Sequence, residues 1–150
     1  MFPTEIRVYP LSKIKEKEDF GTIEKTEEYF CEKLSTRNPS GRFNIPSDHI
    51  EFKKDSLVLF QYAEKKDEEK IIAHAALISD GCIYEKDLDY IGYYLFDINS
   101  INYYKNPVTR KQIFHVWHKK LCQAKLNLDV SKFNDYINLL KRRNNLKSKC

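Results

Sequence analysis

Four apolar or aromatic segments that follow one another between residues 56 and 104 constrain the fold more than any other feature. They are residues 56–62, 71–79, 90–98 and 100–104. The charged stretch 64–70 and the dipeptide Asp80–Gly81 separate the first three segments and are typical of hairpin loops and tight turns. A doubly wound parallel sheet would need a helix between consecutive strands, and no segment in this region fits a helix. We therefore expect these strands to form an antiparallel sheet or a small barrel.

Helices are expected before and after this strand region. The predicted helices, each with its capping residue, cover roughly 22–34 (Thr22), 110–122 (Thr109) and 132–142 (Ser131). Residues 4–9 alternate weakly between apolar and polar side chains and predict one further strand. The sequence thus predicts an α+β fold, a small and mostly antiparallel sheet or barrel flanked by helices.

The length of 150 residues corresponds to about one domain. We expect residues 1–143 to form it, followed by a basic tail or linker at 144–150. Aromatic residues make up 13% of the chain, and such side chains need a core or a ligand, which argues against disorder. The apolar runs are too short to span a bilayer, so we expect no membrane partner.

The N-terminal segment and the cysteines predict the compartment. The first residues lack the basic start and long apolar stretch of a signal peptide. The four cysteines, Cys31, Cys82, Cys122 and Cys150, show no paired spacing. The sequence therefore predicts four free thiols in a reducing cytoplasm.

The charge of the chain is divided unevenly. Residues 1–104 contain 14 Lys and Arg against 20 Asp and Glu, a net charge of −6. Residues 105–150 contain 12 against 2, a net charge of +10, and the sum is the +4 of the whole chain. A basic segment of this kind is typical of proteins that bind a polyanion such as nucleic acid. A solvated basic helical surface is the alternative interpretation.

Residues 35–48 are rich in Pro, Gly, Ser and Asn, as long loops are, and long loops often carry function. The motifs in this region are Arg37–Asn38, Arg42–Phe43–Asn44, Lys54–Asp55, LVLFQY and IIAHAAL, in that order. Over residues 35–80 this order resembles the PUA-like superfamily, in particular its EVE, YTH and ASCH branches. The chain departs from the family pattern at Lys54, where a Gly is usual, and at 35–36, where a Trp is expected.

The resemblance implies a nucleic-acid reader. Members of the superfamily hold one base in a pocket between the barrel and its loops, and many read modified bases. Several members that read DNA precede nuclease or motor domains in bacterial modification-dependent restriction systems. The resemblance therefore implies a module of bacterial defence that binds DNA in preference to RNA, flips a modified base, and works with a nuclease or NTPase partner.

A flipped base needs aromatic rings to stack on and polar groups that read its edge. The candidates for this base pocket are Ser35, Asn38, Phe43, Asn44, Ser47, Tyr62, Tyr93, Tyr94 and Trp117. Tyr93 and Tyr94 are neighbours in a predicted strand, so they point to opposite faces and at most one can line a given pocket. The alternative interpretation is that most of these aromatic residues belong to the core.

Basic side chains near the loop and on the last two predicted helices could follow phosphates and make binding sensitive to salt. These phosphate-contact candidates are Arg37, Arg42, Lys53, Lys54, Lys111, Lys119, Lys120 and Arg142. Each of them could equally be a solvated surface charge.

The sequence contains no GxSxG, P-loop, HExxH or GxGxxG pattern. We therefore expect no catalytic residue, no metal and no cofactor, and a binding module rather than an enzyme. Two alternatives stay open. One is a small ASCH-like ribonuclease, and the other is a protein-interaction domain that binds through an apolar patch.

Overall fold

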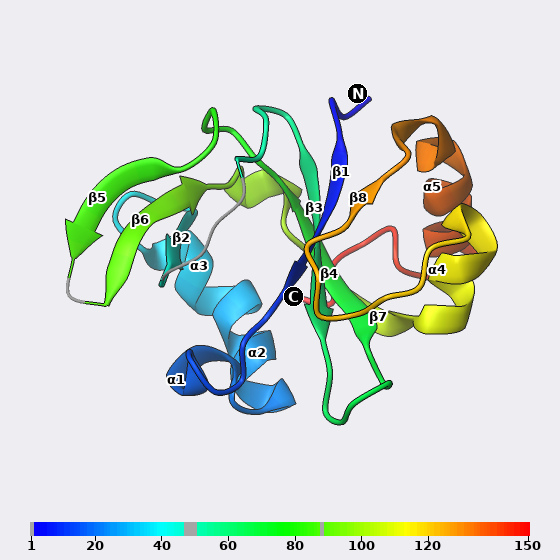
Figure 1. Cartoon of the computed structure of the whole chain (residues 1–150), viewed down its shortest axis with the longest axis horizontal. Coiled ribbons are helices and arrows are strands. Elements are labelled where there is room, and N and C mark those ends of the chain that lie inside the picture. The colour runs from blue at the N-terminus through cyan, green and yellow to red at the C-terminus, as the bar shows by residue number, and fades with distance from the viewer. Residues whose placement is uncertain (1, 47–50, 88) are drawn as a thin grey trace.

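A computed structural model describes residues 2–46, 51–87 and 89–150, whose strands form two sheets (Figure 1). The large sheet has the strand order β7 (Asn102–Thr109), β4 (Lys70–Ala76), β3 (Leu57–Tyr62), β1 (Ile6–Pro10) and β8 (Asn127–Leu128). The small sheet has the order β2 (Arg42–Ile45), β6 (Tyr90–Leu95) and β5 (Ile83–Asp87).

Pairing is antiparallel throughout the described strands except between β1 and β3, which are parallel. Successive strands β3 and β4 are hydrogen-bonded neighbours, and so are β5 and β6, as short connections require. The predicted α+β class is confirmed. The described strands form two sheets and no closed barrel, so the PUA-like architecture stays a prediction.

Strand boundaries differ from the sequence-based expectation in several places: β4 ends at Ala76 rather than at 79, and β7 continues to Thr109 rather than ending at 104. β2 lies inside the stretch predicted as a loop, because Phe43 and Ile45 alternate with outward-facing polar residues and fill the core. The predicted strand 90–98 ends at Leu95, since Asp97 caps the short helix η2 (Ile98–Ser100). β5 is a strand that we did not predict, and its side chains are all exposed.

The first helical region confirms the prediction over 22–34. It comprises α1 (Lys17–Phe20), α2 (Ile23–Glu28), the π-helical turn η1 (Tyr29–Lys33) and α3 (Leu34–Thr36). Thr22 caps α2, and its Oγ1 accepts a hydrogen bond from the Lys25 amide at 3.1 Å.

The last two helices also form, with shifted ends. α4 (Arg110–Trp117) starts at the predicted cap, Thr109, but stops at His118, whose left-handed backbone (φ 56°) ends the helix before residue 122. α5 (Phe133–Arg142) follows the short helix η3 (Val130–Lys132), which Asp129 caps by accepting from the Ser131 amide. The predicted cap Ser131 therefore lies inside η3, and Lys132 at the start of α5 makes no side-chain cap. No helix in the described part of the chain is long and apolar enough to cross a membrane.

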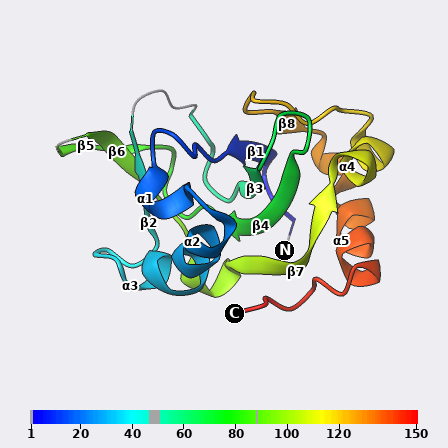
Figure 2. The same cartoon turned by 90° about the horizontal axis from the view of Figure 1, so that it is seen from below.

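β3 lies in the middle of the large sheet and is buried along its whole length. Its side chains alternate between two cores: Val58 and Phe60 pack in one, Leu57 and Leu59 in the other. Figures 1 and 2 show what covers each face. The helices α1–α3 and the small sheet lie on one side of the large sheet, and α4 and α5 lie on the other.

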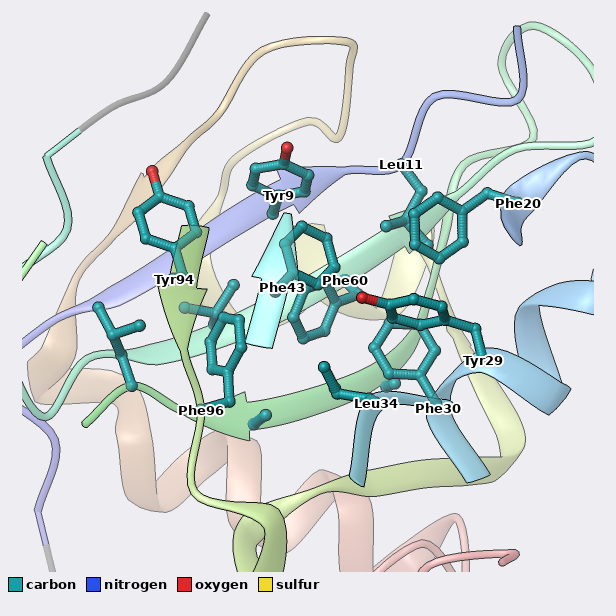
Figure 3. Packing of buried hydrophobic residues seen from close by; sticks show 14 of the residues in the cluster. Tyr9, Leu11, Phe20, Tyr29, Phe30, Leu34, Phe43, Phe60, Tyr94 and Phe96 are labelled. Atoms are coloured by element: carbon teal, nitrogen blue, oxygen red, sulfur yellow. The ribbon is translucent and has the colours of Figure 1, made fainter. Parts of the chain in front are cut away.

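The core beneath α1–α3 is mainly aromatic (Figure 3). Phe43 lies near its centre, with its ring centroid 5.2 Å from that of Tyr9 and 5.4 Å from that of Phe60. Edge-to-face and offset contacts of this kind stabilise the core beyond the area they bury. The space between the two sheets is therefore filled by the protein's own rings.

Residues 144–150, expected as a tail or linker, lie along the edge strand β7. Asn145 is fully buried, and its side chain donates to the Asn106 carbonyl at 2.7 Å and accepts from the Asn106 amide at 3.0 Å. A disulfide joins Cys31 in η1 to Cys150. The prediction of four free thiols is therefore wrong for this pair, while Cys82 and Cys122 are free. The cytoplasmic location stays a prediction.

We predict that Phe43→Ala lowers the free energy of unfolding by about 3–5 kcal/mol, because it leaves a cavity among fully buried rings. The matched control is Phe114→Ala on α4, where the side chain is 51% exposed and the expected loss is under about 1 kcal/mol. Urea unfolding of both variants measures the difference. Equal losses would show that Phe43 is not a central core residue.

Candidate functional site

Four of the aromatic residues predicted for the base pocket lie in the two cores. Phe43 and Tyr94 are almost completely buried in the aromatic core, and Tyr62 belongs to the same cluster. Trp117 packs in the other core, across the large sheet, and its Nε1 donates to the Asp129 carbonyl at 2.9 Å. These four rings therefore do not line one pocket, and the alternative interpretation as core residues describes them.

The three loop candidates lie in different settings. Ser35 Oγ donates to the Glu32 carbonyl at 3.1 Å, within the helical region. Asn38 is exposed and precedes a cis proline. Ser47 lies outside the described residues.

Three candidates do come together, on the outer face of the small sheet. Asn44 and Tyr93 are paired across β2 and β6, and the Arg42 guanidinium lies 4.2 Å from the centroid of the Tyr93 ring. Arg42 Nε donates to Asn44 Oδ1 at 2.9 Å, and Arg42 Nη1 is 3.7 Å from Glu85 Oε1. Tyr94 points into the core, so the predicted opposite orientation of Tyr93 and Tyr94 is confirmed. The guanidinium of Arg42 is thus engaged by side chains of the small sheet.

Arg37 is also bound internally, in a polar cluster at the start of α1. Its Nη2 is 3.3 Å from Asp19 Oδ2, and its guanidinium lies over the Tyr29 ring at 5.2 Å. Glu16 lies in the same cluster and is 8% exposed. Burial and the nearby Asp19 carboxylate raise the pKa of Glu16 to about 7, and Arg37 opposes this shift.

The basic candidates of the C-terminal half have a different environment. Lys111, Lys119, Lys120 and Arg142 are exposed, and none makes an ion pair within the described ranges. They lie on and around α4 and α5, the helices that cover one face of the large sheet (Figure 1). The structure thus places these four cations of the basic segment 105–150 on the exposed side of this layer.

A hollow of about 470 Å³ lies between α4 and α5. We call it the α4–α5 hollow, and it is lined by Lys111, Gln112, Phe114, His115, Leu139 and Arg142. Phe114 is half exposed, and the ring of His118 meets it edge-on with centroids 5.6 Å apart. Among the described residues, no carboxylate lines this hollow, so its electrostatic environment is positive.

The register of α4 explains this arrangement. Ile113, Val116 and Trp117 recur at helical spacing and are buried against the large sheet. Thr109 and Gln112 form a capping box that fixes where the helix begins, and thereby which residues face outward. Phe114 follows Ile113 directly and is therefore turned away from the core. Sequence reasoning did not select Phe114 or His115, although the buried stripe of α4 was a signal that could have found them.

Two further hollows near α4 contain predicted phosphate contacts. Lys53 and Lys119 line one of about 440 Å³, together with residues of β8 and η3. Lys120 lines one of about 650 Å³ with Arg110 and Lys13. Lys54 is exposed, and its carbonyl accepts a hydrogen bond from Thr4 Oγ1 at 2.7 Å. Five of the eight predicted cations therefore lie around α4 and α5.

Within the described ranges, no group of three or more His, Cys, Asp or Glu side chains could hold a metal ion. Comparison with known proteins finds no matching family model, no matching curated protein and no matching solved structure. The function therefore has to be argued from the geometry of this chain.

We predict that Glu16→Gln flattens the pH dependence of stability. In the wild-type protein the carboxyl group has a folded pKa of about 7, against 4.5 as its ordinary value, so the folded state holds the proton longer. The free energy of unfolding therefore falls as pH rises from 4.5 to 7, by an amount on the order of 3 kcal/mol. Below pH 4.5 the contribution of Glu16 is fully present, because the group is protonated in both states.

Urea unfolding of both proteins between pH 4 and pH 8 tests this prediction. Burial lowers the pKa of His74 to about 4, so His74 makes the free energy of unfolding rise with pH, opposite to Glu16. Both proteins contain His74, so the difference between their stability curves reports Glu16 alone. The variant should match the wild type at the acid end and exceed it at the alkaline end. A constant difference across the range would contradict the assignment.

Proposed function

We propose that this protein binds nucleic acid on the surface formed by α4 and α5. The observation that carries the proposal is the α4–α5 hollow, where a half-exposed aromatic ring lies between basic side chains and no described carboxylate opposes them. The net charge of +10 over residues 105–150 supplies the long-range attraction.

The two parts of the hollow have distinct tasks. Lys111 and Arg142 stand at its rim and can contact successive phosphates, with release of counterions. Phe114 offers a ring face to an unpaired base, a contact worth about 1–3 kcal/mol. His115 and the Nε2 group of Gln112, whose Oε1 accepts from the Thr109 amide, line the same hollow and can hydrogen-bond the edge of the base.

An accessible ring favours a base that is already unpaired or has been flipped out of a duplex. We keep DNA as the preferred polymer, a modified base as the specific ligand, and bacterial restriction with a nuclease or NTPase partner as the setting. These three parts of the proposal rest on the PUA-like resemblance and on no contact described above. The placement of the site on α4 and α5 rests on the geometry.

We predict that Phe114→Ala weakens binding of labelled single-stranded DNA about 5- to 150-fold, the equivalent of one lost stacking contact. Lys111→Ala and Arg142→Ala should each lower the slope of log affinity against log salt by about 0.7. Fluorescence anisotropy at two salt concentrations measures both effects. Lys86→Ala on β5 is the matched control, since Lys86 is equally exposed and lies on the other side of the molecule.

The same assay separates the alternatives. Wild-type affinity in both Phe114→Ala and Arg142→Ala would reject the α4–α5 hollow as the site. A preference of about tenfold for an oligonucleotide with a methylated or hydroxymethylated base would establish a modified-base reader. Cleavage of RNA that is lost in His115→Ala would instead favour the ribonuclease alternative.

A further inference from the structure

A second surface, at one end of the large sheet, is unlike the α4–α5 hollow. Two adjoining hollows of about 650 and 310 Å³ share Lys13, Ile14, Ala63 and Gln123 and together make one groove. We call it the Ile14 groove. Three chain segments supply most of it: residues 10–14 at the end of β1, the β3–β4 hairpin at 61–67, and residues 120–125 after α4. Glu69 and Arg110 complete the lining.

The groove has an apolar base and one conspicuous apolar projection. Leu11 and Leu121 are buried beneath it, and Ala63 is partly exposed. Ile14 is 91% exposed in the turn before α1, the highest exposure of any large hydrophobic side chain in the described residues. Covering this side chain with an apolar group of a partner would remove its surface from water and stabilise the complex.

The rim is positively charged once internal pairs are taken into account. Arg110 lies 3.2 Å from Glu69 and 3.9 Å from Asp67, which leaves one negative charge in this group, and Glu64 adds another. The whole lining still holds six Lys and Arg against three Asp and Glu. Lys65, Lys66 and Lys120 line the groove without an ion pair in the described ranges. Lys13 donates to the Glu64 carbonyl at 3.1 Å and adds a further charge. The groove is thus complementary to a ligand with carboxylates.

The side chain of Gln61 indicates that the ligand also carries a hydrogen-bond donor. Its side chain is 1% exposed and lines the groove, and its Nε2 donates to the Cys122 carbonyl at 2.7 Å. Its Oε1 is buried and has no hydrogen-bond partner among the described residues. An unsatisfied buried acceptor destabilises the free protein by about 1–3 kcal/mol. A ligand N–H group that donates to Oε1 would recover this free energy on binding.

We propose that the Ile14 groove binds an acidic peptide segment of a partner protein. Glutamate or aspartate side chains contact the lysines of the rim, an apolar side chain covers Ile14, and a backbone amide donates to Gln61. Nucleic acid fits less well, because none of the lining residues offers an aromatic ring on which a base could stack. This proposal is independent of the α4–α5 hollow.

The test uses the full chain and a short synthetic peptide in which glutamate and leucine alternate, with a lysine–leucine peptide as the matched probe. Fluorescence anisotropy should give a dissociation constant on the order of micromolar for the acidic peptide only. Ile14→Asp and Lys120→Glu change exposed side chains, so the fold is retained, and each should weaken binding at least about tenfold. Lys86→Glu, on the exposed strand β5 away from the groove, should leave peptide binding unchanged.

Cys122 provides a second readout that locates the ligand. It is exposed, free and lines the groove, whereas the other free thiol, Cys82, is buried. The acidic peptide should slow alkylation of Cys122 by iodoacetamide about tenfold at saturation. Cys122→Ser reports the background labelling.

Three outcomes would overturn the proposal. They are no binding of the acidic peptide, binding that both Ile14→Asp and Lys120→Glu leave intact, and unchanged alkylation of Cys122 at saturation. Protection of Cys122 by oligothymidine as strong as that by the peptide would also overturn it, since the groove would then belong to the nucleic-acid surface. Failure of the α4–α5 hollow to bind oligonucleotides leaves these outcomes unaffected.

Discussion

The burial of the large sheet on both faces is the constraint on which the rest of the structure depends. β3 is apolar along nearly its whole length, and alternate side chains must be covered on opposite sides. One layer of helices cannot satisfy both faces. The N-terminal helices with the small sheet cover one face, and α4 with α5 cover the other (Figure 2).

This division determines where a ligand can bind. The face under α1–α3 is filled by Phe43, Phe60 and their aromatic neighbours, which pack on one another (Figure 3). The opposite layer consists of two helices with little chain outside them, so their outer surfaces stay open. Because this layer comes from the basic part of the sequence, the open surface is also the positive one. The packing of the two layers and the distribution of charge therefore both favour α4 and α5 as the place where a ligand binds.

Much of the fold was predictable from patterns that act locally. The strands β3 and β4, the helix capped by Thr22 and the start of α4 at Thr109 follow from periodicity and capping. The disulfide between Cys31 and Cys150 was not predictable, since it joins residues separated by 119 positions that only the fold brings together. β2 was missed because its loop-like composition hides the alternation of Phe43 and Ile45.

The residues around the proposed site could be predicted in part, because local sequence patterns report segment charge but not which single side chains the fold buries. The charge of residues 105–150 groups Lys111, Lys119 and Arg142 in the sequence, because charge is a property of a whole segment, and the structure places them on or next to α4 and α5. The aromatic residues were not separable from core residues, since a ring in a strand has one sequence signature whether it packs inside or faces a ligand. Tyr94 and Trp117 enter different cores, and only the three-dimensional arrangement distinguishes them from Phe114.

The most direct test of the central claim is a map of amide chemical-shift changes by NMR, as oligothymidine is added to the ¹⁵N-labelled protein. The account predicts that the largest changes fall on α4 and α5, around Phe114 and Arg142. Largest changes on β2 and the segment before it, around Arg37 and Asn44, would contradict the account and restore the site that the sequence alone predicts.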